Sequence, residues 1–122
     1  MTFAEIIDLL PAQVIYKGSD FSNFIIRNVV AGDLMSDVLV IEYEDFVMMS
    51  SLNSEQTLIT ADMVGARGIL LVNGKIPNMV MKTMAEKKDI TLLSTSLSMF
   101  EACITLGNLL GLSGPVNIKA LT

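Results

Sequence analysis

The stretch FVMMSSLNSEQTLITADMVGARGILLV, residues 46–72, decides the fold class of this chain. Its two apolar runs, residues 46–49 and 69–72, enclose a segment with helical spacing over 54–65 that ends at a glycine. An apolar run, a helix and a second apolar run are typical of a βαβ unit, whose strands are parallel. Because helices cover both faces of a parallel sheet, its strands are continuously apolar. The stretch therefore predicts an α/β domain.

The same alternation extends over the rest of the chain. Besides the strand over 46–50 and the helix and strand that follow it, we expect a helix over 2–10, strands over 12–17 and 24–31 that pair early in the sheet, a helix beginning at 34, a helix over 77–88, a strand over 90–93 and a helix over 96–110. The prediction is a single domain over 1–122, with a short tail from about 113. Its architecture is a three-layer sandwich around a mostly parallel sheet of about five strands.

Composition limits the kinds of partner. At 122 residues the chain fits one core, and its 52% hydrophobic residues against 17% charged ones leave little charged surface. Part of this apolar excess is expected to face a partner subunit. The net charge of −5 and the pI near 4.5 argue against nucleic acid, because binding a polyanion needs clustered Lys and Arg.

The residue types exclude most familiar active sites. The chain has no histidine and one cysteine, so it lacks the commonest general base and cannot build an iron–sulfur or Cys-rich zinc site. Cys103, within an apolar helical pattern, is expected to be a small core residue in a reducing, cytoplasmic setting. The acidic N-terminal segment predicts no secretory signal. Polar residues, glycines and a proline interrupt the uncharged stretch 102–118, which argues against a membrane span. We expect no cofactor.

Three apolar runs, at residues 46–49, 69–72 and 90–93, stop at small polar residues just before a helical pattern. In open α/β sheets, small molecules bind outside the carboxyl ends of the strands, where loop amides and helix N-termini can neutralise an anion. For Lys75 the alternative is an exposed lysine in an ordinary tight turn, and for residues 94–96 it is plain helix capping. The candidate ligand-binding residues at this edge are Ser51, Asn73, Gly74, Lys75, Thr95 and Ser96.

Carboxylates offer an alternative chemistry. Asp33 and Asp37 lie four residues apart, so that on one helical face they would hold a magnesium ion with waters. Capping of the helix that begins at residue 34 is the role favoured for Asp33. Nothing in the spacing isolates two catalytic carboxylates in a cleft, and we predict no catalytic residue and no metal ligand. The acidic residues concerned are Asp33, Asp37, Glu42, Glu44 and Asp45.

The last helix, over 96–110, is apolar around nearly its whole circumference. Such a helix must be covered on more than one side, either by full burial in the monomer or by burial in a homodimer. The homodimer is favoured, because a domain of this size does not easily enclose an outer helix. The methionines at 79, 81 and 84 are either core filler or an adaptable binding face.

Three segments carry a resemblance to a known family: GDLMSDVL at 32–39, GKIP at 74–77 and MFEAC at 99–103. Together they resemble the DRTGG domain over residues 4–112, and more closely its small stand-alone members encoded near iron-only hydrogenase genes. The family's naming motif is degenerate here, since Leu52-Asn53 stands at its Asp-Arg element and Val72-Asn73-Gly74 at its Thr-Gly-Gly. The resemblance implies a Rossmann-like sandwich similar to the N-terminal domain of HPr kinase, with roles in regulation and subunit contact.

These observations support three functional hypotheses. The first is a non-catalytic regulatory or accessory domain that dimerises and senses a small anionic or nucleotide ligand. The second is a protein-interaction module for a redox or kinase partner. The third is a magnesium-dependent enzyme that acts on a phosphorylated substrate through Asp33 and Asp37.

Overall fold

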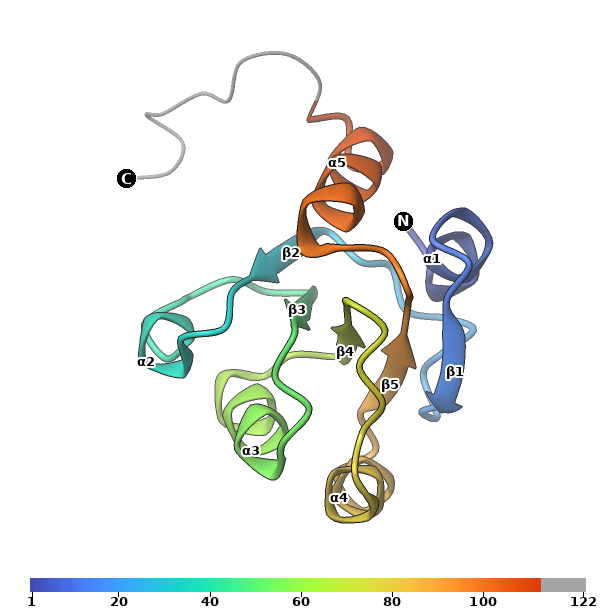
Figure 1. Cartoon of the computed structure of the whole chain (residues 1–122). Helices are drawn as coiled ribbons and strands as arrows, with labels where there is room; N and C mark the ends of the chain where they lie inside the picture. The colour runs from blue at the N-terminus through green and yellow to red at the C-terminus, as the bar shows by residue number, and fades with distance from the viewer. Residues whose placement is uncertain (113–122) are drawn as a thin grey trace.

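A computed structural model of the chain describes residues 1–112, and the tail expected from about residue 113 lies outside them. Helices and strands alternate along the described chain (Figure 1). In chain order they are α1 (Phe3–Leu9), β1 (Gln13–Tyr16), β2 (Asn28–Ala31), α2 (Met35–Val38), β3 (Phe46–Ser50), α3 (Glu55–Val64), β4 (Gly68–Leu71), α4 (Met79–Lys88), β5 (Thr91–Ser94) and α5 (Met99–Leu109).

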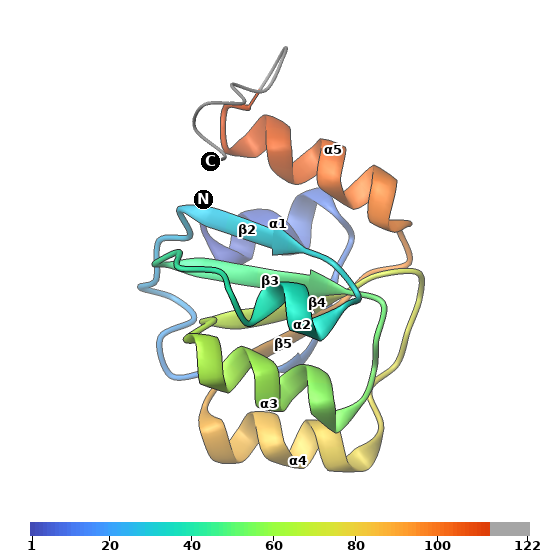
Figure 2. The ribbon, with the colours of Figure 1, turned by 90° about the vertical axis from the view of Figure 1, so that its left-hand side faces the viewer.

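The five strands form one sheet in the order β1-β5-β4-β3-β2. Strands β2, β3, β4 and β5 are parallel to one another, and β1 pairs antiparallel with β5. Helices α2, α3 and α4 cover one face of the sheet, and α1 and α5 cover the other (Figures 1 and 2). The predicted three-layer sandwich with a mostly parallel sheet of five strands is confirmed.

Successive strand residues point to opposite faces and so build two cores. In β3, Phe46 and Met48 join the core under α2, α3 and α4, whereas Val47 and Met49 join the core under α1 and α5. All five residues of β3 are buried, as are all four residues of β4 and of β5. This two-sided burial explains why residues 46–72 decide the fold class.

The N-terminal part differs from the prediction. The strands near residues 12–17 and 24–31 do not pair, because β1 and β2 lie at opposite edges of the sheet. The second strand is also shorter than expected: the amides of Asn23 and Phe24 donate to the carbonyl of Asp20 and form a turn. Phe24 and Ile26 are buried from this irregular segment, so burial and not sheet pairing accounts for the apolar run.

The helix expected from residue 34 is a single turn, α2. Its N-cap is Leu34, whose side chain makes no capping hydrogen bond, so the predicted capping role of Asp33 is wrong. The parallel strands all end toward the same side of the molecule, at the right in Figure 2. That edge holds the residues expected to bind a ligand.

Candidate functional site

Hydrogen bonds join the loops that follow β3, β4 and β5 at this edge. The Asn53 side-chain amide donates to the carbonyl of Ile76 over 2.7 Å, which links the loop after β3 to the loop after β4. The Ser94 hydroxyl donates to the carbonyl of Lys75 over 2.7 Å, and the amide of Gly74 donates to the carbonyl of Thr95 over 2.9 Å. The three loops therefore form one connected surface.

Asn73-Gly74 forms the tight turn expected between β4 and α4. Both residues have positive φ, 60° and 66°, and the amide of Lys75 donates to the carbonyl of Val72. Asparagine and glycine adopt this left-handed conformation most easily, which explains the sequence of the turn. Because the amides of residues 73–75 all donate to backbone carbonyls, they are committed to the loop.

The predicted ligand-binding residues differ in exposure. Asn73, Gly74, Lys75 and Ser96 are exposed, Ser51 is half-buried and Thr95 is buried. The Thr95 hydroxyl donates to the carbonyl of Leu10 and accepts from the amide of Leu97. Among residues 1–112, Lys75 takes part in none of the ion pairs. In the part of the chain that the structure describes, Lys75 is thus an exposed cation without an ion pair at this edge and Ser96 an exposed hydroxyl, whereas Thr95 joins the loop after β5 to the end of α1.

Asp33 lies at the other end of this edge from Lys75 and Ser96, between the ends of β2 and β3. Its carboxylate accepts from the Ser50 hydroxyl over 2.9 Å, from the Ser51 amide over 2.7 Å and from the Ser51 hydroxyl. The Ser51 hydroxyl and amide, together with the Ser50 hydroxyl, lower the pKa of the Asp33 carboxyl below its usual value. Asp33 therefore connects β2 to β3 as an ionised group.

The stability of the domain is expected to depend on this ionisation. The unfolded chain binds the Asp33 proton near the ordinary pKa of about 3.9, and the folded chain binds it at lower pH. The contribution of Asp33 is therefore complete above about pH 5 and is lost as the pH falls through the folded pKa. Asp33→Asn should lower the free energy of unfolding by about 1–2 kcal/mol at about pH 7, because it weakens the hydrogen bonds to Ser50 and Ser51. The loss stays this small because Asp33 is solvent-exposed. Urea unfolding at several pH values measures the difference.

The difference between wild type and Asp33→Asn should shrink as the pH falls toward about 3. Asp89 and Glu101 also have a pKa lowered by hydrogen bonds, and both proteins share these groups. They therefore cancel in the comparison. An equal difference at neutral and acidic pH would contradict the ionised role of Asp33.

The other carboxylates do not converge. Asp33 lies outside α2, so it does not share a helical face with Asp37, although both line a hollow of about 220 Å³ between β2 and α2. Asp45 pairs with Arg27 over 3.5 Å. Within residues 1–112, no group of three or more His, Cys, Asp and Glu side chains is arranged to hold a metal ion.

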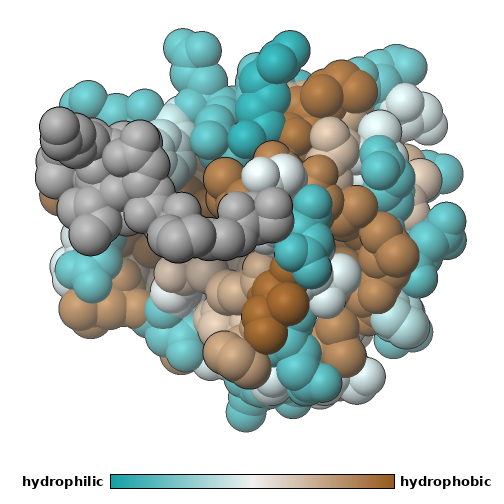
Figure 3. All heavy atoms as spheres, turned by 90° about the horizontal axis from the view of Figure 1, so that it is seen from above, coloured by the Kyte–Doolittle hydropathy of each residue, from teal (hydrophilic) through white to brown (hydrophobic). Residues whose placement is uncertain are grey.

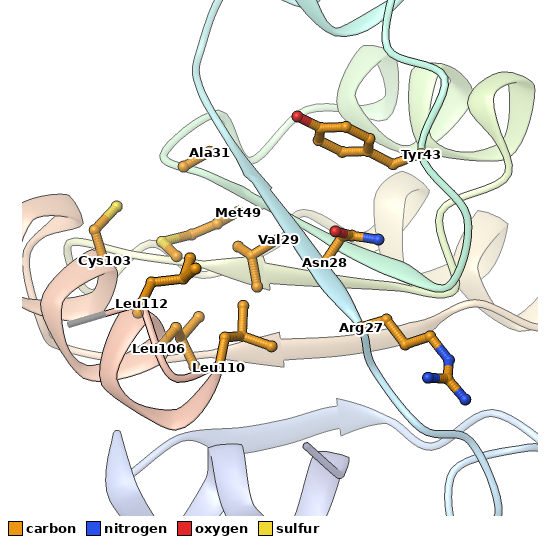
Figure 4. Close-up of a pocket in the computed structure, with 11 residues that line it drawn as sticks. Arg27, Asn28, Val29, Ala31, Tyr43, Met49, Cys103, Leu106, Leu110 and Leu112 are labelled. Atoms are coloured by element: carbon orange, nitrogen blue, oxygen red, sulfur yellow. The ribbon is translucent and has the colours of Figure 1, made fainter. Parts of the chain in front are cut away.

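A second hollow, of about 430 Å³, lies between α5 and the outer strand β2 (Figure 4). The side chains of Val29, Leu106 and Leu110 gather in it, whereas the Arg27 guanidinium points away from them (Figure 4). Sequence reasoning missed this groove. The apolar circumference of the last helix was the signal for such a groove, but the sequence did not show that β2 lies beside this helix.

Cys103 lines this groove and is exposed, so the expectation of a core cysteine is wrong. Partial burial raises the pKa of its thiol. Phe100 and Ile104 of α5 are also exposed, as is Leu112, which lines the groove. Hydrophobic side chains are visible on the face that carries α1 and α5 (Figure 3).

The fold and this edge define the class of protein, a three-layer α/β domain with polar loops at the carboxyl ends of its strands. No protein-family model matches the chain, and no curated protein matches it. Among solved structures, the chain is similar to the CBS and DRTGG domains of the regulatory region of Clostridium perfringens pyrophosphatase, in complex with the activator diadenosine tetraphosphate.

That similarity has a TM-score of 0.67 at 19% sequence identity. It covers 86% of this chain and 45% of the other, so this chain spans less than half the length of its structural neighbour. The likeness shows a shared fold, and the neighbour contains a DRTGG domain, the family that the sequence resembles. No helix within residues 1–112 is long and apolar enough to cross a membrane.

Proposed function

We propose that this chain is a non-catalytic, cytoplasmic regulatory domain that binds a small anionic or nucleotide ligand and forms a homodimer. The observation that carries the proposal is the fold shared with a regulatory region that binds a nucleotide activator. The DRTGG resemblance at residues 32–39, 74–77 and 99–103 supports the same role.

The proposed ligand site is the edge formed by Ser51, Asn73, Gly74, Lys75, Thr95 and Ser96. Its two ends differ in charge, because Asp33 is ionised beside Ser51 whereas Lys75 is exposed. An anion is therefore bound at the Lys75 end, away from the carboxylate. The Ser96 hydroxyl serves as a hydrogen-bond donor there, and the buried Thr95 positions the loop without touching the ligand.

The ligand is identified by measuring the melting temperature of the protein with one compound at a time, with and without magnesium. The compounds are nucleotides, dinucleotides and acyl phosphates. A ligand that binds the folded state raises that temperature by mass action, by an amount equivalent to about 2.7 kcal/mol at one hundred times its Kd. Failure of every compound to raise the melting temperature would contradict the sensor function.

Lys75→Ala is expected to reduce the ligand-induced shift at least by half and to leave the melting temperature of the free protein unchanged, because the Lys75 side chain is exposed. The matched control is Lys87→Ala, which removes an exposed lysine from the last turn of α4. An equal loss of the shift in both variants would indicate a general effect of charge and would contradict the assigned site.

The exposed apolar side of α5 favours a second candidate, a module that docks on a redox or kinase protein. Phe100 is 74% exposed and Ile104 is 50% exposed, which is unusual for a helix of ordinary surface composition. In this function no small ligand raises the melting temperature, and a partner protein protects Phe100 and Ile104 from solvent.

A further inference from the structure

Within residues 1–112, the outer strand β2 pairs only with β3 and has one edge without a partner in the sheet. The amide of Gly32 donates to Met49 and the amide of Asn28 donates to Asp45, so these residues face β3. Alternate residues of a parallel strand direct their backbone groups to opposite sides. The N–H and C=O groups of Val29 and Ala31 therefore point away from the sheet, and no strand among residues 1–112 pairs with them.

The two edges of the sheet are protected differently. The β1 edge carries a register irregularity between Val14 and Tyr16 and is followed at once by Lys17, and bulges and lysines are devices that prevent strand addition. The β2 edge pairs in unbroken register with β3, and its sequence Asn-Val-Val-Ala contains neither lysine nor proline. Strand addition is thus opposed at β1 and permitted at β2.

Helix α5 presents an apolar flank to this free edge. At 100° per residue, Cys103, Gly107 and Leu110 lie on one flank of α5, where they line the groove along β2. Glu101, Thr105 and Asn108 lie on the opposite flank. The apolar residues therefore face the open side of β2, and the polar ones face away from it.

We propose that β2 pairs antiparallel with β2 of a second copy of this chain, with Val30 opposite Val30 of that copy. This inference rests on the homodimer of the proposed function and assigns its interface. Val29 then lies opposite Ala31 of the second copy, and the two outward-facing residues exchange both backbone hydrogen bonds. The pairing occurs twice, so the two sheets join into one.

Charge selects this register over its neighbours. Arg27 precedes β2 and is exposed, where it also pairs with Asp45 over 3.5 Å, and Asp33 follows β2 as an ionised carboxylate. With Val30 opposite Val30 of the second copy, each Arg27 lies opposite an Asp33 of that copy. A shift by two residues would separate both pairs of charges. A shift by one residue would place inward-facing backbone groups at the junction.

The same pairing brings apolar surface together. The two-fold axis of an antiparallel strand pair is perpendicular to the sheet, so both α5 helices lie on one face of the joined sheet. Their flanks with Cys103 and Leu110, and the exposed Phe100, then face one another across the axis. A stable interface buries about 1,200–2,000 Å² in total. The two strand edges alone are too small for this area, so the α5 helices must contribute to the interface.

A disulfide cross-link tests the register in the full chain carrying Cys103→Ala. Val30→Cys is expected to form a covalent dimer on oxidation, because directly opposed residues lie about 4.5–5.5 Å apart between Cα atoms, within the range of a disulfide. Ala31→Cys is the matched control. In the proposed register, position 31 of one copy is diagonal to position 31 of the second copy, about 7–8 Å away, so Ala31→Cys should cross-link much more slowly. Non-reducing electrophoresis over time measures both rates.

Accessibility alone predicts the opposite order, because Val30 is 8% exposed and Ala31 is exposed. Faster cross-linking at position 30 therefore supports the pairing, and faster cross-linking at position 31 would overturn it. Sedimentation separates the β2 interface proposed here from the homodimer of the proposed function. A dimer that does not cross-link at position 30 would overturn the β2 interface and leave the homodimer intact. A protein that remains monomeric at about 100 µM, which is at the weak end of specific association, would overturn both.

Ala31→Pro supplies a second test that does not depend on a disulfide. Proline removes the outward amide of Ala31 and is tolerated on the free side of an edge strand, so the domain is expected to stay folded. Each dimer loses two hydrogen bonds, and the dissociation constant should rise by about tenfold or more. An unchanged dissociation constant in a folded variant would overturn the pairing.

Discussion

Replacing Phe3 with alanine is expected to lower the free energy of unfolding by about 3–5 kcal/mol. The Phe3 ring is fully buried, and its centroid lies 5.4 Å from that of Phe21 and 5.9 Å from that of Phe24. Truncation removes this burial and leaves a cavity beneath α1. Urea unfolding followed by far-UV circular dichroism measures the loss. A change below about 1 kcal/mol would contradict the central place of Phe3 in this core.

Gly68, the first residue of β4, allows a direct test of how tightly the Phe3 ring is packed. A Cβ atom at Gly68 would lie 2.7 Å from Cε1 and 2.9 Å from Cζ of Phe3, closer than packed atoms approach. Gly68→Ala should therefore destabilise the wild type by about 1–3 kcal/mol. In the Phe3→Ala background the ring is absent, and the same substitution should be nearly neutral. The double-mutant cycle reports the difference, and additive effects would contradict the contact.

A glycine elsewhere in the chain serves as the control for this cycle. A Cβ atom at Gly107, in α5, would meet no atom within 4 Å. Gly107→Ala should raise stability by up to about 1 kcal/mol, because alanine is the better helix former. The opposite signs expected at positions 68 and 107 separate overpacking from backbone entropy.

The central βα units could be predicted because their local and tertiary signals agree. Residues 46–50, 69–72 and 90–93 are apolar except for Ser50 and Thr91, because both faces of the sheet are covered, and the structure places strands there to within one residue at each end. The Asn73-Gly74 turn follows from the left-handed conformations that these residues adopt easily. These features depend on residues close together in the chain.

The position of β1 could not be predicted, because it depends on residues far apart in the sequence. Gln13 lies opposite Ser94, and Val14 lies opposite Leu93, across about eighty residues of chain. Nothing local indicates this pairing. The apolar run at 24–31 resembled a full strand, but the turn at Asp20 and the burial of Phe24 take its first half out of the sheet.

The residues of the candidate site were predicted to lie at one edge, and the structure places them in the loops that follow β3, β4 and β5. Their hydrogen bonds were not predictable. An aspartate before a helical pattern is typical of a cap, yet Asp33 binds Ser50 and Ser51, whose position depends on the alignment of β2 with β3. The use of Asp33 is thus determined by tertiary structure.

Thr95→Val is expected to lower the free energy of unfolding by about 2–3 kcal/mol. The Thr95 side chain is 2% exposed, and its hydroxyl donates to the carbonyl of Leu10 and accepts from the amide of Leu97. Valine fills the same volume, so the substitution removes both hydrogen bonds and creates no cavity. The Leu10 carbonyl and the Leu97 amide then lose their partner. Urea unfolding of Thr95→Val and wild type measures the effect.

Thr95→Ser keeps the hydroxyl and loses one methyl group, so it should lower the free energy of unfolding by only about 1 kcal/mol. A larger loss in Thr95→Ser than in Thr95→Val would show that packing, and not hydrogen bonding, is the contribution of this side chain. The two variants therefore separate the two physical roles of one buried residue.

Thr95→Val also distinguishes a structural residue from a ligand contact at the same edge. The free Thr95→Val protein should melt at a lower temperature than wild type, but an anionic ligand should still raise its melting temperature, because the Thr95 hydroxyl faces Leu10 and not solvent. Lys75→Ala should do the reverse, with an unchanged free protein and a reduced ligand-induced shift. If folded Thr95→Val lost the shift completely, the hydroxyl would have to turn from Leu10 toward the ligand, and the loop after β5 would be a moving part of the sensor.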